Sequence, residues 1–170
     1  MKRPLLIDLD GVLRLGKTPA PGLEEFFSYI ASSDRKCAII SNTTLSTAES
    51  ILAYFDERNI NVPCLLMTAA DATAFFIKSK YERAAVFATP TVKELFTGFL
   101  DYQNPEVVVM GDMGKEWNYV LLNDIFKFVQ SGAELVAMQK NKFWSTPEDG
   151  LLLDLGAFVS AVEYSTGKTV

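Results

Sequence analysis

The chain has 170 residues, of which 49% are apolar and 22% charged, a balance typical of a globular protein rather than a disordered one. Its net charge of −5 argues against nucleic-acid binding, which depends on Lys and Arg neutralising phosphates, but it leaves a small phosphorylated substrate open. The chain has no histidine, which excludes Ser-His-Asp triads and His-ligated zinc. Any catalysis must therefore come from carboxylates, hydroxyls, lysines or a hard metal ion.

The first 81 residues alternate short apolar runs with amphipathic segments, which is typical of an α/β protein with a parallel sheet. A loop containing Gly and Pro, residues 11–22, follows the first apolar run. The predicted strands are residues 4–8, 37–40 and 65–67, and the predicted helices begin near Leu23, Thr47 and Ala69.

The same pattern starts again after a soft boundary at residues 79–83. We therefore predict two parts, residues 1–81 and residues 82–170. In the second part the predicted strands are 84–88, 106–110, 134–138 and 151–154, and the predicted helices are 91–100, 119–130 and 157–165.

Neither a membrane span nor a signal peptide is predicted. No apolar run is long enough to cross a bilayer, and Asp8 interrupts the run at the N-terminus. We therefore expect a cytoplasmic protein without a membrane partner. The two cysteines, Cys37 and Cys64, lie among apolar neighbours, and we interpret them as buried free thiols rather than as a disulfide or a zinc site.

Two carboxylates, Asp8 and Asp10, lie where the first predicted strand meets its loop. Alternation along the chain directs both to one side and Leu9 to the core. One carboxylate can attack phosphorus while the other acts as general acid and base, and Mg²⁺ can neutralise the charge between them. Gly11 allows a sharp turn, and we expect its amide to face an anion.

Ser41 and Asn42 follow the second predicted strand. Because parallel strands end at the same edge of a sheet, we expect them near Asp8 and Asp10. A hydroxyl and amides at that edge can hold phosphate oxygens.

Residues 8–13, Asp-Leu-Asp-Gly-Val-Leu, resemble the first motif of the haloacid dehalogenase-like (HAD) hydrolases, D-x-D-G-[TV]. Residues 39–42 resemble the second motif, an apolar strand that ends in Ser or Thr. The chain as a whole is similar to the NagD-like subgroup with a C2-type cap, including members similar to phospholysine/phosphohistidine phosphatases. The further segments that carry this likeness are 21–22, 117–119, 132–133, 140–144 and 150–158.

The resemblance implies a Mg²⁺-dependent phosphatase with a Rossmann-like core and an α/β cap. Asp8 would be the nucleophile and a Mg²⁺ ligand. Asp10 would be the acid and base, and a Mg²⁺ ligand through its backbone carbonyl. Ser41, helped by Asn42, would bind the transferring phosphoryl group. Residues 82–170 would cover the site and select a small phosphorylated substrate.

The chain departs from the family pattern near its C-terminus. The family carries a Gly-Lys-Pro segment after the cap and a later Asp that completes the metal site, and neither is visible before Val170. Lys168 is not equated with the family lysine. We therefore expect an incomplete core sheet and weak or no turnover from this chain alone. One alternative is a non-catalytic chain that binds or forms a homodimer through the open sheet edge.

A second alternative is a small HAD phosphatase without a cap. Residues 107–112, Val-Val-Val-Met-Gly-Asp, read like the fourth motif, and Lys93 precedes them on a predicted helix. Lys93 and Asp112 would then complete the site. We prefer Asp112 as a cap-loop residue, because the second acid expected soon after it is absent unless Glu116 serves.

Overall fold

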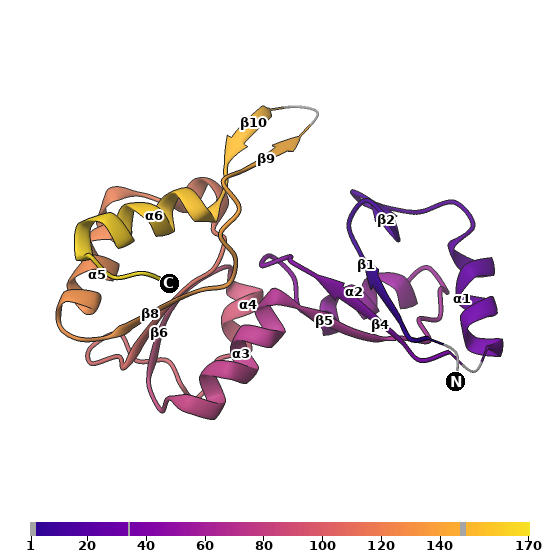
Figure 1. Cartoon of the computed structure of the whole chain (residues 1–170), viewed down its shortest axis with the longest axis horizontal. Helices are drawn as coiled ribbons and strands as arrows, with labels where there is room; N and C mark the ends of the chain where they lie inside the picture. Colours follow the sequence, from indigo (N-terminus) through magenta and orange to yellow (C-terminus); the bar gives the residue numbers. More distant parts are fainter. Residues whose placement is uncertain (1–2, 34, 147–148) are drawn as a thin grey trace.

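The computed structural model describes residues 3–33, 35–146 and 149–170. Its elements gather into two units, each built on a three-stranded parallel sheet (Figure 1). The α/β class predicted from the sequence is confirmed. The first sheet has the order β1 (Leu5–Asp8), β4 (Cys37–Ser41), β5 (Leu65–Thr68), and the second has the order β6 (Ala84–Phe87), β7 (Val107–Met110), β8 (Glu134–Ala137).

In the first unit, α1 (Leu23–Ser32) and α2 (Ala48–Asp56) cover one face of the sheet. Alternation along the strands turns a set of apolar side chains into that core. A small hairpin, β2 (Arg14–Leu15) and β3 (Thr18–Pro19), follows β1. The opposite face of the sheet is exposed, although parallel sheets are usually covered on both faces. Its exposed apolar side chains are Leu6, Ile40, Leu65 and Met67.

The second sheet is covered on both faces. Helices α3 (Ala69–Lys80) and α4 (Pro90–Glu94) pack on one side, and α5 (Tyr119–Gln130) and α6 (Leu155–Thr166) on the other. Every residue of β6 and β7 is buried, which explains their uninterrupted apolar sequences. A 3₁₀ turn, Gly114–Glu116, precedes α5. A hairpin of β9 (Phe143–Thr146) and β10 (Gly150–Leu153) projects from this unit (Figure 1).

Among the described helices, none combines the length and apolar character that a membrane crossing requires.

Helix α3 joins the two units. Its N-cap, Thr68, is the last residue of β5, but its buried side chains belong to the core of the second sheet. Asp71 in its first turn accepts hydrogen bonds from Thr68 N (3.1 Å) and from Ala48 N at the start of α2 (2.8 Å). One carboxylate therefore caps the N-termini of two helices. A division between residues 81 and 82 stays a prediction, and packing assigns α3 to the second core.

The predicted helix over residues 91–100 is too long. Helix α4 ends at Glu94, and Gly98 takes the left-handed conformation with φ +87°. The chain then returns to the sheet, where Ala84 N donates to Phe99 O (2.7 Å) and Asp101 N donates to Ala84 O (2.9 Å). These long-range bonds outweigh helical periodicity at Leu95–Leu100.

Cys37 and Cys64 form a disulfide, so the prediction of two free thiols is wrong. The register explains the pairing. Ala38 pairs with Leu65, so the two cysteines are neighbours at the starts of β4 and β5. The predicted cytoplasmic location stays a prediction, and the disulfide weighs against it because disulfides are rare in reducing compartments.

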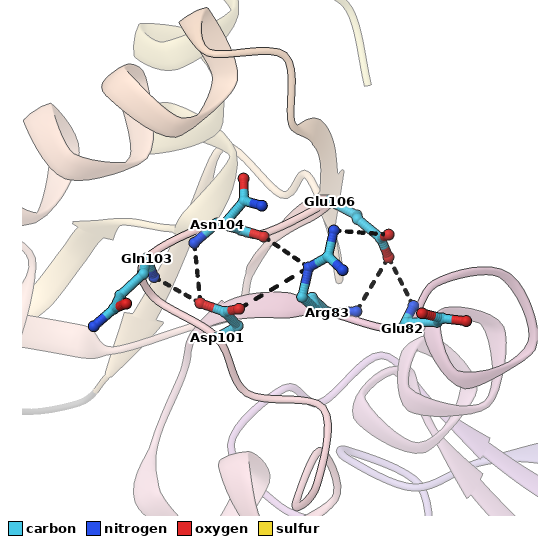
Figure 2. A network of polar contacts seen from close by, with 6 residues as sticks. All are labelled: Glu82, Arg83, Asp101, Gln103, Asn104 and Glu106. Atoms are coloured by element: carbon cyan, nitrogen blue, oxygen red, sulfur yellow. Dashed lines mark hydrogen bonds and ion pairs between the residues drawn. The ribbon is translucent and has the colours of Figure 1, made fainter.

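A network of polar contacts links the residues that directly precede β6 and β7 (Figure 2). Arg83 Nη2 lies 3.1 Å from Glu106 Oε1, and Arg83 Nε donates to Asn104 O (3.0 Å). Backbone N–H groups of Glu82 and Arg83, with the Arg83 charge, hold the pKa of Glu106 below its usual range. Backbone N–H groups of residues 104 and 103, with Arg83, likewise lower the pKa of Asp101.

This network predicts acid sensitivity. A carboxylate with a lowered folded pKa stabilises the protein above its unfolded pKa, about 4.3 for Glu, and that stabilisation is lost as pH falls through the folded value. We expect Glu106→Gln to unfold with a shallower pH dependence below about pH 4.5 than the wild type. Denaturant unfolding at neutral and acid pH measures this difference. Glu82→Gln, whose side chain points away from the network (Figure 2), is the matched control, and equal slopes in all three proteins would contradict the expectation.

Candidate active site

The carboxyl ends of β1 and β4 bring the predicted site residues together. Asp8 ends β1 and pairs with Ile40, so Ser41 lies one residue further along the neighbouring strand. Leu9 is fully buried, while Asp8 and Asp10 are exposed, as alternation predicts. Both carboxylates therefore lie on the solvent side of the sheet edge. Asp8 Oδ1 accepts a hydrogen bond from Leu9 N at 2.8 Å, which leaves its second oxygen for chemistry.

The loop after Asp8 is closed by its own backbone. Leu9 O accepts from Leu13 N (2.9 Å) and Arg14 N (3.1 Å), and Gly11 N donates to Arg14 O (2.8 Å). Gly11 has φ +84°, a conformation that glycine adopts without strain. The Gly11 amide closes the turn in this structure, and its predicted contact with an anion stays a prediction.

Asp10 forms an ion pair that the sequence analysis missed. Its Oδ1 accepts a hydrogen bond from Arg14 Nε at 2.7 Å. The Arg14 side chain is only 16% exposed and the Asp10 side chain is 45% exposed. An acid four residues before a base in a loop is too common a pattern to reveal this contact.

The polar residues after β4 divide into buried and exposed groups. Ser41 is buried, and its Oγ accepts a hydrogen bond from Thr43 N at 3.2 Å. Asn42 is exposed and lines a cavity. Thr44 is buried, and its Oγ1 accepts from Asp112 N at 3.3 Å. This last bond joins the first unit to the end of β7 in the second.

A cavity of about 260 Å³ lies where the two units meet. Both units contribute residues to it, so no single segment of sequence reveals it. A larger cavity of about 550 Å³ runs along α2 and contains none of the predicted site residues. The smaller cavity is therefore the candidate site, and it is lined by Asp10, Asn42, Thr43, Thr44, Leu45, Asp112, Gln139, Asn141, Trp144 and Asp154.

Asp154 shapes the far wall of this cavity. It is buried and is the N-cap of α6, with Oδ1 accepting from Gln139 Nε2 (2.6 Å) and from Leu155 N (2.7 Å). Gly156 N donates to Asn141 O at 2.9 Å. These bonds fix the segment 139–141 against the start of α6, and so fix the amide side chains that line the cavity.

The donors at the sheet edge fit Mg²⁺ in part. Mg²⁺ prefers oxygen ligands and commonly takes one or two carboxylates together with waters and substrate phosphates. The Asp8 carboxylate and the Asp10 carbonyl supply such oxygens. Within residues 3–33, 35–146 and 149–170, no group of three or more acidic, Cys or His residues is arranged to hold a metal ion.

The alternative in which Lys93 and Asp112 complete the site does not hold. Strand β7 pairs with β6 and β8, so residues 107–110 belong to a different sheet from Asp8. Lys93 lies on α4 and lines a separate cavity with Phe87 and Tyr102. Asp112 reaches the candidate site only as part of the second unit.

Residues 5–99 match the family model of the haloacid dehalogenase-like hydrolases, and the chain belongs to this family. It is 28% identical over 165 residues to haloacid dehalogenase-like hydrolase domain-containing protein 2 of Mus musculus, covering 96% of this chain and 63% of that protein. It is 25% identical over 172 residues to a phospholysine phosphohistidine inorganic pyrophosphate phosphatase of Mus musculus, covering 97% and 63%. The chain thus spans less than two thirds of the length of these relatives.

Solved structures share the fold. A 4-nitrophenylphosphatase from Thermotoga maritima superposes with a TM-score of 0.84 at 23% identity, covering 96% of this chain and 64% of that one. NagD from E. coli K-12 gives a TM-score of 0.81 at 23% identity, covering 98% and 66%. The predicted likeness to NagD-like HAD proteins is confirmed.

Proposed function

We propose that this chain carries the nucleophile and the substrate-facing wall of a Mg²⁺-dependent phosphoric monoester hydrolase. The observation that carries the proposal is that Asp8 and Ser41 lie at the carboxyl ends of the paired strands β1 and β4, with Asp10 lining the cavity between the units. Relatives named as phosphatases support the same class of reaction. The proposed substrate class is a small phosphorylated metabolite, and a cavity of about 260 Å³ beside Asp10 suits a small ligand.

The reaction has two steps on this chain. The free oxygen of Asp8 attacks phosphorus, an acyl-phosphate bond forms, and the bond from phosphorus to the leaving oxygen breaks as Asp10 gives that oxygen its proton. Asp10 then takes a proton from water, which attacks phosphorus and releases inorganic phosphate from Asp8. Ser41 and Asn42 would hold the non-bridging phosphate oxygens. When bound at Asp8 and the Asp10 carbonyl, Mg²⁺ would neutralise charge between phosphate and carboxylates.

The metal requirement gives a direct test. We expect the chain to release p-nitrophenol from p-nitrophenyl phosphate with Mg²⁺, at least as a first burst of one equivalent, and to lose that release when EDTA removes the metal. The burst reports phosphorylation of Asp8 even where the second step is slow. Equal release of p-nitrophenol with and without Mg²⁺ would contradict the proposal. The absence of p-nitrophenol release under both conditions would also contradict it.

Self-association is a second candidate function. It is supported by the uncovered face of the first sheet, where Leu6 is 74% and Leu65 is 80% exposed. The edge strands β1 and β5 add unpaired backbone groups at its borders. Sedimentation velocity over a range of concentrations decides between a monomer and a homodimer.

A further inference from the structure

We propose that Arg14 is a positioning residue of the site, which fixes the Asp10 carboxylate in the orientation that the acid and base step requires. This inference rests on the proposed function, because it assigns a role within the same reaction. It starts from the ion pair between Arg14 Nε and Asp10 Oδ1 at 2.7 Å.

Arg14 contacts the catalytic loop through both its backbone and its side chain. Its carbonyl accepts from Gly11 N, its amide donates to Leu9 O, and residues 10 and 14 form an isolated β-bridge. The guanidinium adds a side-chain hydrogen bond to Asp10, so that Arg14 is bonded to this loop at both its backbone and its side chain. Arginine suits this task, since its planar donors hold a carboxylate at a defined angle and not merely at a distance.

Helix α2 holds Arg14 in place. The Arg14 Cζ lies 5.8 Å from the centre of the Tyr54 ring, and the Tyr54 hydroxyl donates to Lys17 O at 3.0 Å. Arg58 covers the same ring at 3.9 Å. The guanidinium of Arg14 therefore lies against an aromatic ring that is itself bonded to the β2–β3 hairpin, and its freedom to leave Asp10 is small.

Charge around Asp10 makes this contact consequential. Asp8 and Asp10 are two residues apart, and the cavity adds the carboxylates of Asp112 and Asp154. Among the residues that line this cavity in the described part of the chain, none is Lys or Arg. Without Arg14, repulsion would favour an Asp10 rotamer turned away from its neighbours. An Asp10 side chain turned away in this manner would lower kcat and leave substrate binding unchanged, because Asp10 acts on the leaving oxygen.

Three variants of the full chain test the inference: Arg14→Ala, Arg14→Lys and, as a matched control, Lys17→Ala. Lys17 is an exposed cation in the same hairpin, and its ammonium forms no hydrogen bond or ion pair within the described residues. With p-nitrophenyl phosphate and Mg²⁺, we expect Arg14→Ala to lower kcat by about 10- to 100-fold with KM unchanged. Arg14→Lys should recover part of the loss, and Lys17→Ala should behave as the wild type. An unchanged kcat in Arg14→Ala would overturn the inference.

A spectroscopic measurement separates this inference from the proposed function. In a ¹H–¹⁵N spectrum, the Arg14 Nε–H should give a resolved, slowly exchanging signal in the wild type that is lost in Asp10→Ala, which removes the accepting oxygen. If the wild type releases no p-nitrophenol, the proposed function fails, and the signal alone then decides whether Arg14 orients Asp10. A signal absent from the wild type, or unchanged in Asp10→Ala, overturns the inference.

Discussion

Asp8→Asn is expected to lower the rate of p-nitrophenol release from p-nitrophenyl phosphate by a factor on the order of 10³ or more. An amide oxygen is neutral and a poor nucleophile, so the acyl-phosphate bond cannot form at a useful rate. The substitution keeps the size of the side chain, and the Asn oxygen can still accept the hydrogen bond that Asp8 takes from Leu9 N. The loss should therefore appear in activity and not in folding.

Two measurements check this result. Release of p-nitrophenol gives the rate, and intact mass after acid quenching shows whether a phosphoryl group is attached to the protein. The matched control is Asp56→Asn, the same change at an exposed position at the end of α2. We expect that variant to retain wild-type activity. A phosphorylated Asp8→Asn protein, or equal loss in both variants, would show that Asp8 is not the nucleophile.

Most elements of the second unit could be predicted closely, because local and long-range forces agree there except at residues 95–100. Residues 119–130 were predicted as a helix and form α5 with those bounds, since Asn118 caps the first turn and Ile125 and Val129 are buried. Strands β6 and β7 are apolar throughout because helices cover both faces. The projecting hairpin was only half predicted. In β9, Phe143, Trp144 and Ser145 are exposed, and the strand sequence does not alternate between apolar and polar residues, so only β10 has a strand pattern in the sequence.

Only the part of the candidate site that lies at the ends of the strands could be predicted from the sequence. Asp8 and Ser41 follow from the rule that parallel strands end at one edge. The wall formed by Asp112, Gln139 and Asp154 depends on how the units pack, and no local pattern encodes that. The prediction of free thiols at Cys37 and Cys64 failed for a related reason, since their disulfide depends on the register of β4 and β5.

Phe55→Ala should destabilise the first unit by about 3–5 kcal/mol, because it removes a large, fully buried ring from a small core. The Phe55 ring makes edge contacts with Phe27 at 6.3 Å and with Tyr54 at 5.0 Å. Phe75→Ala is the matched control, since that ring is 78% exposed on α3, and a change within about 0.5 kcal/mol is expected.

Tryptophan fluorescence and circular dichroism can follow the unfolding of the two units separately. Its two tryptophans, Trp117 and Trp144, both belong to the second unit, so their fluorescence reports that unit, while far-UV circular dichroism reports both. The buried clusters of the two units share no residue. We therefore expect Phe55→Ala to move the denaturant midpoint seen by circular dichroism and to leave the tryptophan midpoint in place. Equal shifts by both probes would mean that the Asp71 and Thr44 contacts couple the units into one cooperative fold.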